Sequence, residues 1–93
     1  MSKVKKIVSP LSVGSAVLIR TVTHYYTGRV ALVKASEVVL TDAAWIADTG
    51  RWHNALRDGT LNEVEPFMGP VSVNREHITD CTAWNHALPM VQK

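Results

Sequence analysis

The chain has 93 residues and a formal net charge of +2, with 46% hydrophobic residues, which is the size and composition of one globular domain. Three of its ten basic side chains, Lys3, Lys5 and Lys6, lie within the first six residues. The rest of the chain has seven basic and eight acidic side chains. The body is therefore near neutral, which argues against a broad phosphate-binding surface, because non-specific nucleic-acid affinity comes mainly from clustered lysine and arginine.

The cysteine content and the hydropathy of the chain exclude several classes of protein. Cys81 is the only cysteine, so the chain cannot form an internal disulfide or a thiolate-rich zinc site. No apolar run approaches the roughly 20 residues of a membrane span, and the charged N-terminus lacks the apolar stretch of a secretory signal. We expect a soluble, cytoplasmic protein with no membrane partner.

The first half of the chain predicts three strands. Residues 16–23 (AVLIRTVT) are strong β-formers with apolar side chains on both faces around Val17–Ile19, which is typical of a strand buried on both sides or facing a partner subunit. A turn is expected over 24–28, ending at Gly28, and a second strand over 29–35. A third strand begins at 38–41, and the short connections make successive strands antiparallel neighbours.

A long excursion is expected over residues 43–60. Its alanines favour helix, Asp42 can cap one, and Thr49–Gly50 would stop it. We expect one short helical turn near Ala55–Arg57, closed by Asp58–Gly59.

Two further strands complete the prediction. Residues 61–67 alternate, and Pro66 limits this strand to an edge or an end of the sheet. Residues 71–81 form a fifth strand bent at 74–76. The fold class is all-β, a five-stranded bent antiparallel sheet over 14–82, with a lead-in at 1–13 and a tail at 83–93.

Two segments resemble the signatures of the Sm-like family, a group of small SH3-like barrels. GRV at 28–30 followed by VVLTDA at 38–43 looks like the first signature, and VSVNREHI at 71–78 looks like the second. The stretches TVTHYYTGRV and DAAWIADTGR are similar to small Sm-like proteins of phage or cyanophage origin. The resemblance implies a small barrel that assembles head-to-tail into a homo-oligomeric ring, a pentamer or hexamer, and that binds RNA.

The residues at the family's RNA-reading positions differ here. Sm proteins read uridine with an Asp and an Asn between the second and third strands and with an Arg-Gly in the last bend. This chain has Lys34, Ser36 and Glu37 in the first place and Asn74–Arg75 without a following glycine in the second. Lys34 and Arg75 can hold phosphate, but the loop has no aromatic residue for stacking.

Two other groups are candidate ligand sites. Arg51, Trp52 and His53, with Arg57 nearby, combine forked phosphate donors with a stacking face. The alternative is a loop whose tryptophan plugs the barrel while its arginines pair with Asp48 and Asp58.

The second group is His24-Tyr25-Tyr26, which is typical of an exposed stacking platform. The alternative is a hairpin with one core tyrosine and one interface tyrosine.

Catalytic and metal chemistry are not expected. The four histidines show no zinc-ligand spacing, and no carboxylate pair suggests acid–base catalysis. Cys81 stands in a predicted strand, where a small buried hydrophobe is the simpler interpretation than a nucleophile. We expect no enzyme activity, no cofactor and no metal.

Three hypotheses follow. The first is a ring that binds RNA or single-stranded DNA weakly through Lys34 and Arg75 around a pore. The second is a binder that sequesters a phosphate-bearing nucleotide between subunits, through Arg51, Trp52, Tyr25 and Tyr26. The third is a structural role in virion assembly.

Overall fold

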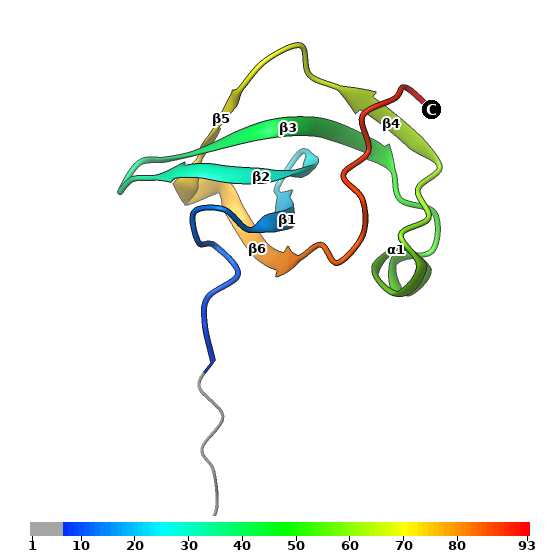
Figure 1. Cartoon of the computed structure of the whole chain (residues 1–93), viewed down its shortest axis with the longest axis horizontal. Helices are drawn as coiled ribbons and strands as arrows, with labels where there is room; N and C mark the ends of the chain where they lie inside the picture. Colours follow the sequence, from blue (N-terminus) through cyan, green and yellow to red (C-terminus); the bar gives the residue numbers. More distant parts are fainter. Residues whose placement is uncertain (1–6) are drawn as a thin grey trace, which may run out of the picture.

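The computed structural model describes residues 7–93 and consists mainly of antiparallel strands (Figure 1). The strands are β1 (Ala16–Thr21), β2 (Tyr25–Val33), β3 (Glu37–Asp48), β4 (Glu63–Pro66), β5 (Val71–Asn74) and β6 (Ile78–Ala83). One helix, α1 (Trp52–Asp58), follows β3, and a 3-10 turn, η1 (Arg75–His77), joins β5 to β6. The predicted all-β class is confirmed. Lys3, Lys5 and Lys6, with the start of the expected lead-in, lie outside the described residues.

The strands form one bent sheet in the order β4-β3-β2-β1-β6, with β5 also paired to β3. Residues 44–48 of β3 pair with β4, and residues 37–40 pair with β5. Within the described chain, the path of paired strands ends at β4 and β6 and does not close into a cylinder. The single bent fifth strand expected over 71–81 is instead two strands, because η1 turns the chain away from β3 and lets β6 pair with β1.

Strand β3 is longer than the sequence predicts and removes the first part of the expected 43–60 excursion. It continues to Asp48 through Ala43 and Ala44, which are buried. A Cβ added at Gly28 of β2 would meet the Cβ atoms of Leu40 at 3.0 Å and Ala43 at 3.2 Å, so small residues are needed where these strands approach. Strand pairing therefore overrides the helix preference of alanine.

The first turn is also shorter than predicted. The Thr21 amide donates to the His24 carbonyl at 2.8 Å, which closes the turn before Tyr25 begins β2. Tyr25 and Tyr26 are therefore strand residues, and their side chains point to opposite faces of the sheet.

Apolar side chains pack on both faces of the sheet. The first core contains Val17, Ile19, Val30, Val38, Leu40, Ala43 and Val73. The second contains Leu18, Ala44, Ile46, Ala55, Leu61, Val64 and Trp84. Because Leu18 lies in one core and its neighbours Val17 and Ile19 in the other, the prediction that this strand is buried on both faces is confirmed.

Helix α1 and the C-terminal tail contribute to the second core. The helix ends at Gly59, whose φ of 74° is left-handed and whose amide donates to the Ala55 carbonyl at 2.9 Å, as the Asp58–Gly59 stop predicts. The tail crosses back from β6 toward β4 (Figure 1), with Trp84 only 3% exposed. Lys93 and Val64 exchange two backbone hydrogen bonds of 3.0 Å, so the tail also covers part of the β4 edge. Among the described helices, none has the length and apolar character needed to cross a bilayer.

Candidate functional site

Three of the predicted site residues, Lys34, Asn74 and Arg75, meet at one end of the sheet, and we call them the tip cluster. Lys34 lies just after β2, and its amide donates to the Glu37 carbonyl at 2.8 Å to close the β2–β3 hairpin. Arg75 begins η1, and its Nη1 donates to the Lys34 carbonyl at 2.8 Å. The Arg75 amide also donates to the Ser36 carbonyl at 3.1 Å. The hairpin and the β5–η1 junction, distant in sequence, are therefore held together.

The tip cluster is exposed and carries mixed charge. The side chain of Asn74 accepts from the Glu76 amide at 3.0 Å and so caps η1. The Glu37 carboxylate accepts from the Ser72 hydroxyl at 2.7 Å. Because Glu37 and Glu76 belong to the same two segments as Lys34 and Arg75, this end of the sheet is not a concentrated basic surface.

Tyr25 and Trp52 form a second group on the α1 side of the sheet. Their rings meet edge to face with centroids 5.6 Å apart. The Arg20 guanidinium carbon lies 5.2 Å from the Trp52 ring centroid, and Arg20 also forms an ion pair with Asp80. This pairing raises the pKa of Arg20 and holds the pKa of Asp80 below its usual range, chiefly through the side-chain hydrogen bonds. Trp52 is thus packed against the sheet, and a cation already lies over its ring.

The charged residues at α1 are exposed and partly paired. Arg57 donates to both oxygens of Asp58 at 2.9 Å, and this lowers the pKa of the Asp58 carboxyl. The predicted alternative pairing of Asp58 is therefore present. Asp48 instead accepts from the Gly50 amide at 2.8 Å. Arg51 and His53, the sequence neighbours of Trp52, are solvent-exposed and do not line an enclosed site with it.

Tyr26 lies on the opposite face, in a group that the sequence prediction captured only in part. His24, Tyr26, Trp45 and Phe67 form an aromatic group with centroid separations of 6.0 Å for His24–Tyr26, 5.5 Å for His24–Trp45 and 6.0 Å for Tyr26–Phe67. Trp45 is 39% exposed and Phe67 is 38% exposed. With Glu65 and Pro66 these rings line a surface hollow of about 340 Å³, which we call the aromatic hollow.

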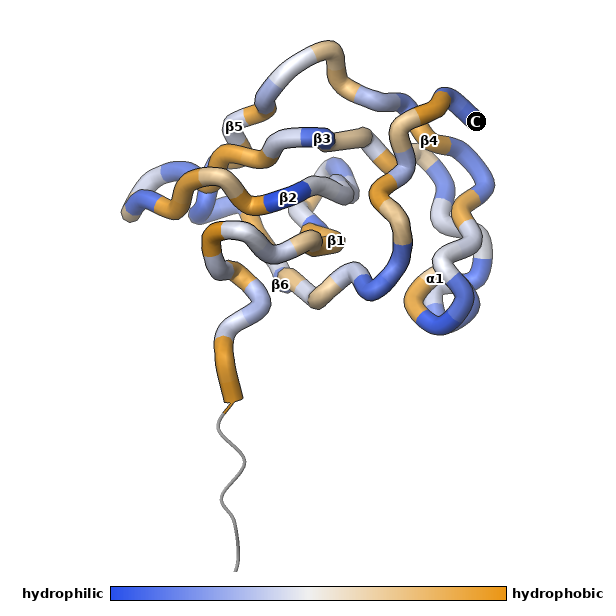
Figure 2. Tube along the Cα trace, viewed as in Figure 1, coloured by the Kyte–Doolittle hydropathy of each residue, from blue (hydrophilic) through white to orange (hydrophobic). Residues whose placement is uncertain are grey.

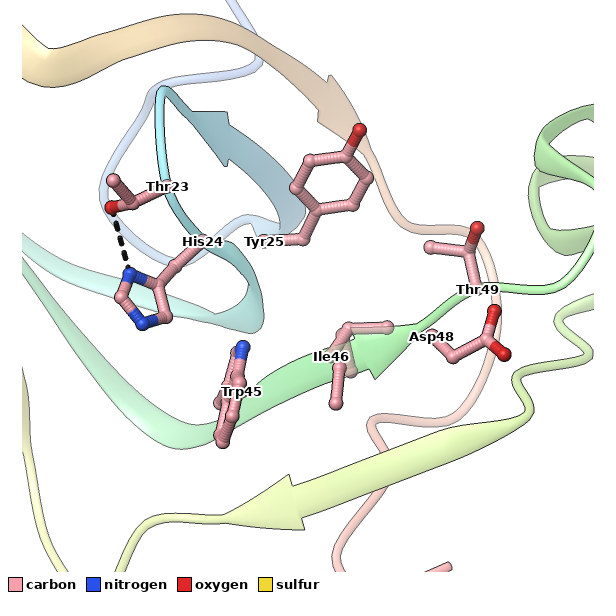
Figure 3. A pocket seen from close by; sticks show the side chains of 8 residues that line it. Thr23, His24, Tyr25, Trp45, Ile46, Asp48 and Thr49 are labelled. Atoms are coloured by element: carbon pink, nitrogen blue, oxygen red, sulfur yellow. Dashed lines mark hydrogen bonds between the residues drawn. The ribbon is translucent and has the colours of Figure 1, made fainter.

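A second hollow of about 300 Å³ adjoins the first and shares His24 and Trp45 with it. Figure 3 shows the Tyr25 ring extending away from His24, and Asp48 and Thr49 at the far end. His24 Nδ1 and the Thr23 hydroxyl lie 2.8 Å apart (Figure 3). Trp45 therefore stands between two hollows.

Sequence reasoning missed Trp45, Glu65 and Phe67 as surface site residues. In β3, Trp45 precedes the buried Ile46, so period-two alternation places the two on opposite faces. That signal is available once residues 43–48 are recognised as a strand rather than an excursion.

Neither Cys81 nor the described His, Asp and Glu side chains form a reactive or metal-binding group. Cys81 is half-buried against the first core, and desolvation, with a smaller contribution from the Asp80 charge, raises the pKa of its thiol to about 11. Residues 7–93 contain no group of three or more His, Cys, Asp or Glu side chains placed to hold a metal ion. A thiol with this pKa is a poor nucleophile near neutral pH.

Comparisons with protein-family models, with curated proteins and with solved structures found no match.

Proposed function

We propose that the protein is a non-enzymatic binding protein of Sm-like type and phage origin, which forms a closed ring and binds RNA or single-stranded DNA through the tip cluster. The observation that carries the proposal is the hydrogen bond of 2.8 Å from Arg75 Nη1 to the Lys34 carbonyl. It brings two cations, 41 positions apart in sequence, to one end of the sheet.

The open sheet supports assembly. Within the described chain, β5 pairs only with β3 and β6 pairs only with β1, so each has an edge available to a second copy. Unpaired edges are liabilities that head-to-tail ring closure removes. Ile7 and Val8, at the start of the described chain, are 92% and 69% exposed, which supplies further apolar surface to a neighbour. Figure 2 shows the hydrophobic first segment of the described chain extending away from the sheet.

Ring assembly would compensate for the small charge of one tip cluster. A ring of five or six copies carries five or six Lys34–Arg75 pairs around one axis. Each cation that contacts a phosphate releases a counterion, so affinity should fall with salt by a logarithmic slope of about 0.7 per contact for a single strand. We expect weak binding with a measurable salt slope and little sequence preference.

Fluorescence anisotropy of labelled oligouridylate and oligothymidylate, at several salt concentrations from 50 to 200 mM, tests this function. Lys34→Ala with Arg75→Ala is expected to lower both the affinity and the salt slope. Arg51→Ala with Arg57→Ala is the matched control, because it removes the same amount of charge from α1 and its N-cap. If the control lowers the slope and the tip variant does not, the tip cluster is not the binding site.

The nucleotide-binding alternative has weaker geometric support. Tyr25 and Tyr26 point to opposite faces, and Arg20 already lies over Trp52, so within one chain Arg51, Trp52, Tyr25 and Tyr26 do not line one site. The expected pocket would have to form between subunits. Thermal stabilisation by nucleotides but not by oligonucleotides would favour this alternative. A ring that binds neither ligand, but binds a virion protein, would favour the assembly role.

A further inference from the structure

The aromatic hollow has an ordered cross-strand arrangement that the tip-cluster function does not use. Tyr26 of β2 is the register partner of Trp45 of β3, and Trp45 is the register partner of Glu65 of β4. Directly opposed residues in antiparallel strands share a face, so these three side chains form a row across the sheet. His24 and Phe67 flank this row, and the amide of Phe67 donates to the Ala43 carbonyl at 2.9 Å, which fixes its backbone.

The charge around the hollow is negative. Glu65 lines the aromatic hollow and Asp48 lines the adjoining one, and among residues 7–93 no lysine or arginine lines either. Gln92 of the tail donates to Glu65 Oε1 at 3.2 Å, which holds the carboxylate beside the rings. The surface therefore combines aromatic rings with acidic groups, whereas Lys34 and Arg75 give the tip cluster two cations.

We propose that the aromatic hollow binds a small quaternary ammonium cation. Aromatic rings attract cations through the negative potential of their faces, and methylated ammonium groups suit this chemistry because they also bury apolar methyl groups. The hollow, at about 340 Å³, lies within the usual range for small-molecule sites. Glu65 supplies the charge complement.

A nucleotide or a nucleic acid fits the same surface poorly. Rings of this kind can stack bases, but Glu65 would lie beside an anionic phosphate, and no lysine or arginine from the described part of the chain lines the hollow to offset its charge. The hollow and the tip cluster lie toward opposite ends of β2, since Tyr26 is the second residue of the strand and Lys34 follows its last residue, about 26 Å away in an ideal extended strand. Loss of either function therefore leaves the other measurable.

The test is a titration of the full-length protein with choline chloride, followed by ¹H–¹⁵N NMR, including the three indole N–H signals. The neutral isostere 3,3-dimethylbutan-1-ol is the ligand control, because it keeps the shape of choline and removes its charge. We expect choline to shift the Trp45 indole and the Phe67 amide, and the isostere to bind about threefold to thirtyfold more weakly.

Two variants locate the site. Glu65→Gln is expected to weaken choline binding about threefold to tenfold while leaving isostere binding unchanged. Its matched control is Glu63→Gln, which removes the same charge from the exposed end of β4 and should leave choline binding unchanged. Phe67→Leu keeps an apolar side chain without a π face, and should also weaken choline binding.

Equal affinity for choline and its isostere would overturn the proposal, as would shifts confined to residues outside the hollow. Shifts of Trp45 and Phe67 that appear on concentrating the protein without ligand would assign the surface to a second copy instead. Binding to phosphatidylcholine vesicles without binding to free choline would likewise overturn the assignment to a small cation.

Discussion

Arg20 and Asp80 are register partners in the β1–β6 ladder, and Arg20 Nε donates to both Asp80 carboxylate oxygens at 2.9 Å. Because Arg20 also lies over the Trp52 ring, one guanidinium connects β1, β6 and α1. The two side chains are 36% and 44% exposed, so solvent screens the pair and its contribution to stability is modest.

Asp80→Asn should therefore reduce the free energy of unfolding at pH 7 by less than about 1 kcal/mol. Because the ion pair lowers the pKa of Asp80 in the folded chain, its stabilisation is complete above the unfolded pKa of about 4 and is lost as the pH falls through the lower folded value. Urea denaturation at pH 7, 4 and 2.5 should show a flatter acid dependence for the variant. Parallel stability profiles for the two proteins would show that the pair has no such role.

The Cys81 thiol should react slowly in the folded protein. Desolvation raises its pKa to about 11, so at pH 8 roughly one thiol in a thousand is ionised, against about a quarter in the unfolded chain. Reaction with a chromogenic disulfide should accelerate by more than about a hundredfold in denaturant. Asp80→Asn should slightly raise the reaction rate of the native Cys81 thiol, because it removes the Asp80 charge, the smaller of the two causes that raise the thiol pKa. A native rate close to the denatured one would contradict this burial.

Thr27→Val should stabilise the fold. Thr27 is fully buried, and within the described structure its hydroxyl has no hydrogen-bond partner, so an apolar group of the same shape removes a desolvation cost of about 1 kcal/mol. Thr21→Val is the matched control. The Thr21 hydroxyl donates to the His24 carbonyl at 2.8 Å and accepts from the His24 amide at 2.9 Å, so this change should cost about 1–2 kcal/mol. Thermal denaturation that moves both variants in the same direction would refute the distinction.

Gly59→Ala should destabilise the attachment of α1 to the tail. Gly59 has a φ of 74°, and an added Cβ would lie 2.7 Å from Cγ of His86, whose Nε2 lies 2.8 Å from the Leu56 carbonyl oxygen. The left-handed conformation alone costs about 1–2 kcal/mol with a side chain present. Gly69→Ala is the control, since a Cβ there meets nothing within 4 Å. Equal melting temperatures for the two variants would show that this cap is not needed.

The sequence was sufficient for the features that local chemistry determines. The Val17–Ile19 run predicts a strand buried on both faces, and Asp58–Gly59 predicts the end of the only helix in the described chain. Lys34 and Arg75 were both named from the sequence, and the structure joins them through the hydrogen bond from Arg75 Nη1 to the Lys34 carbonyl. Their binding role stays a prediction.

The features that could not be predicted from the sequence depend on contacts between segments that are distant along the chain. Asp42 looks like a helix cap, but its φ of 49° lets β3 bend where its register with β2 shifts. Ala43 and Ala44 suggest a helix by their intrinsic preference. The sequence gives no sign that Gly28 of β2 packs closely against Ala43 of β3. The aromatic hollow was missed for the same reason, since it combines residues of the β1–β2 turn, β2, β3 and β4 with Phe67, which follows β4.

Native mass spectrometry of the freshly purified protein, without nuclease treatment or salt stripping, tests the central claim most directly. We expect a closed oligomer of five or six chains, which carries extra mass from bound RNA or DNA or acquires it when oligouridylate is added. A bare monomer that stays monomeric at every concentration, with or without the oligonucleotide, would contradict the ring and the binding function built on it.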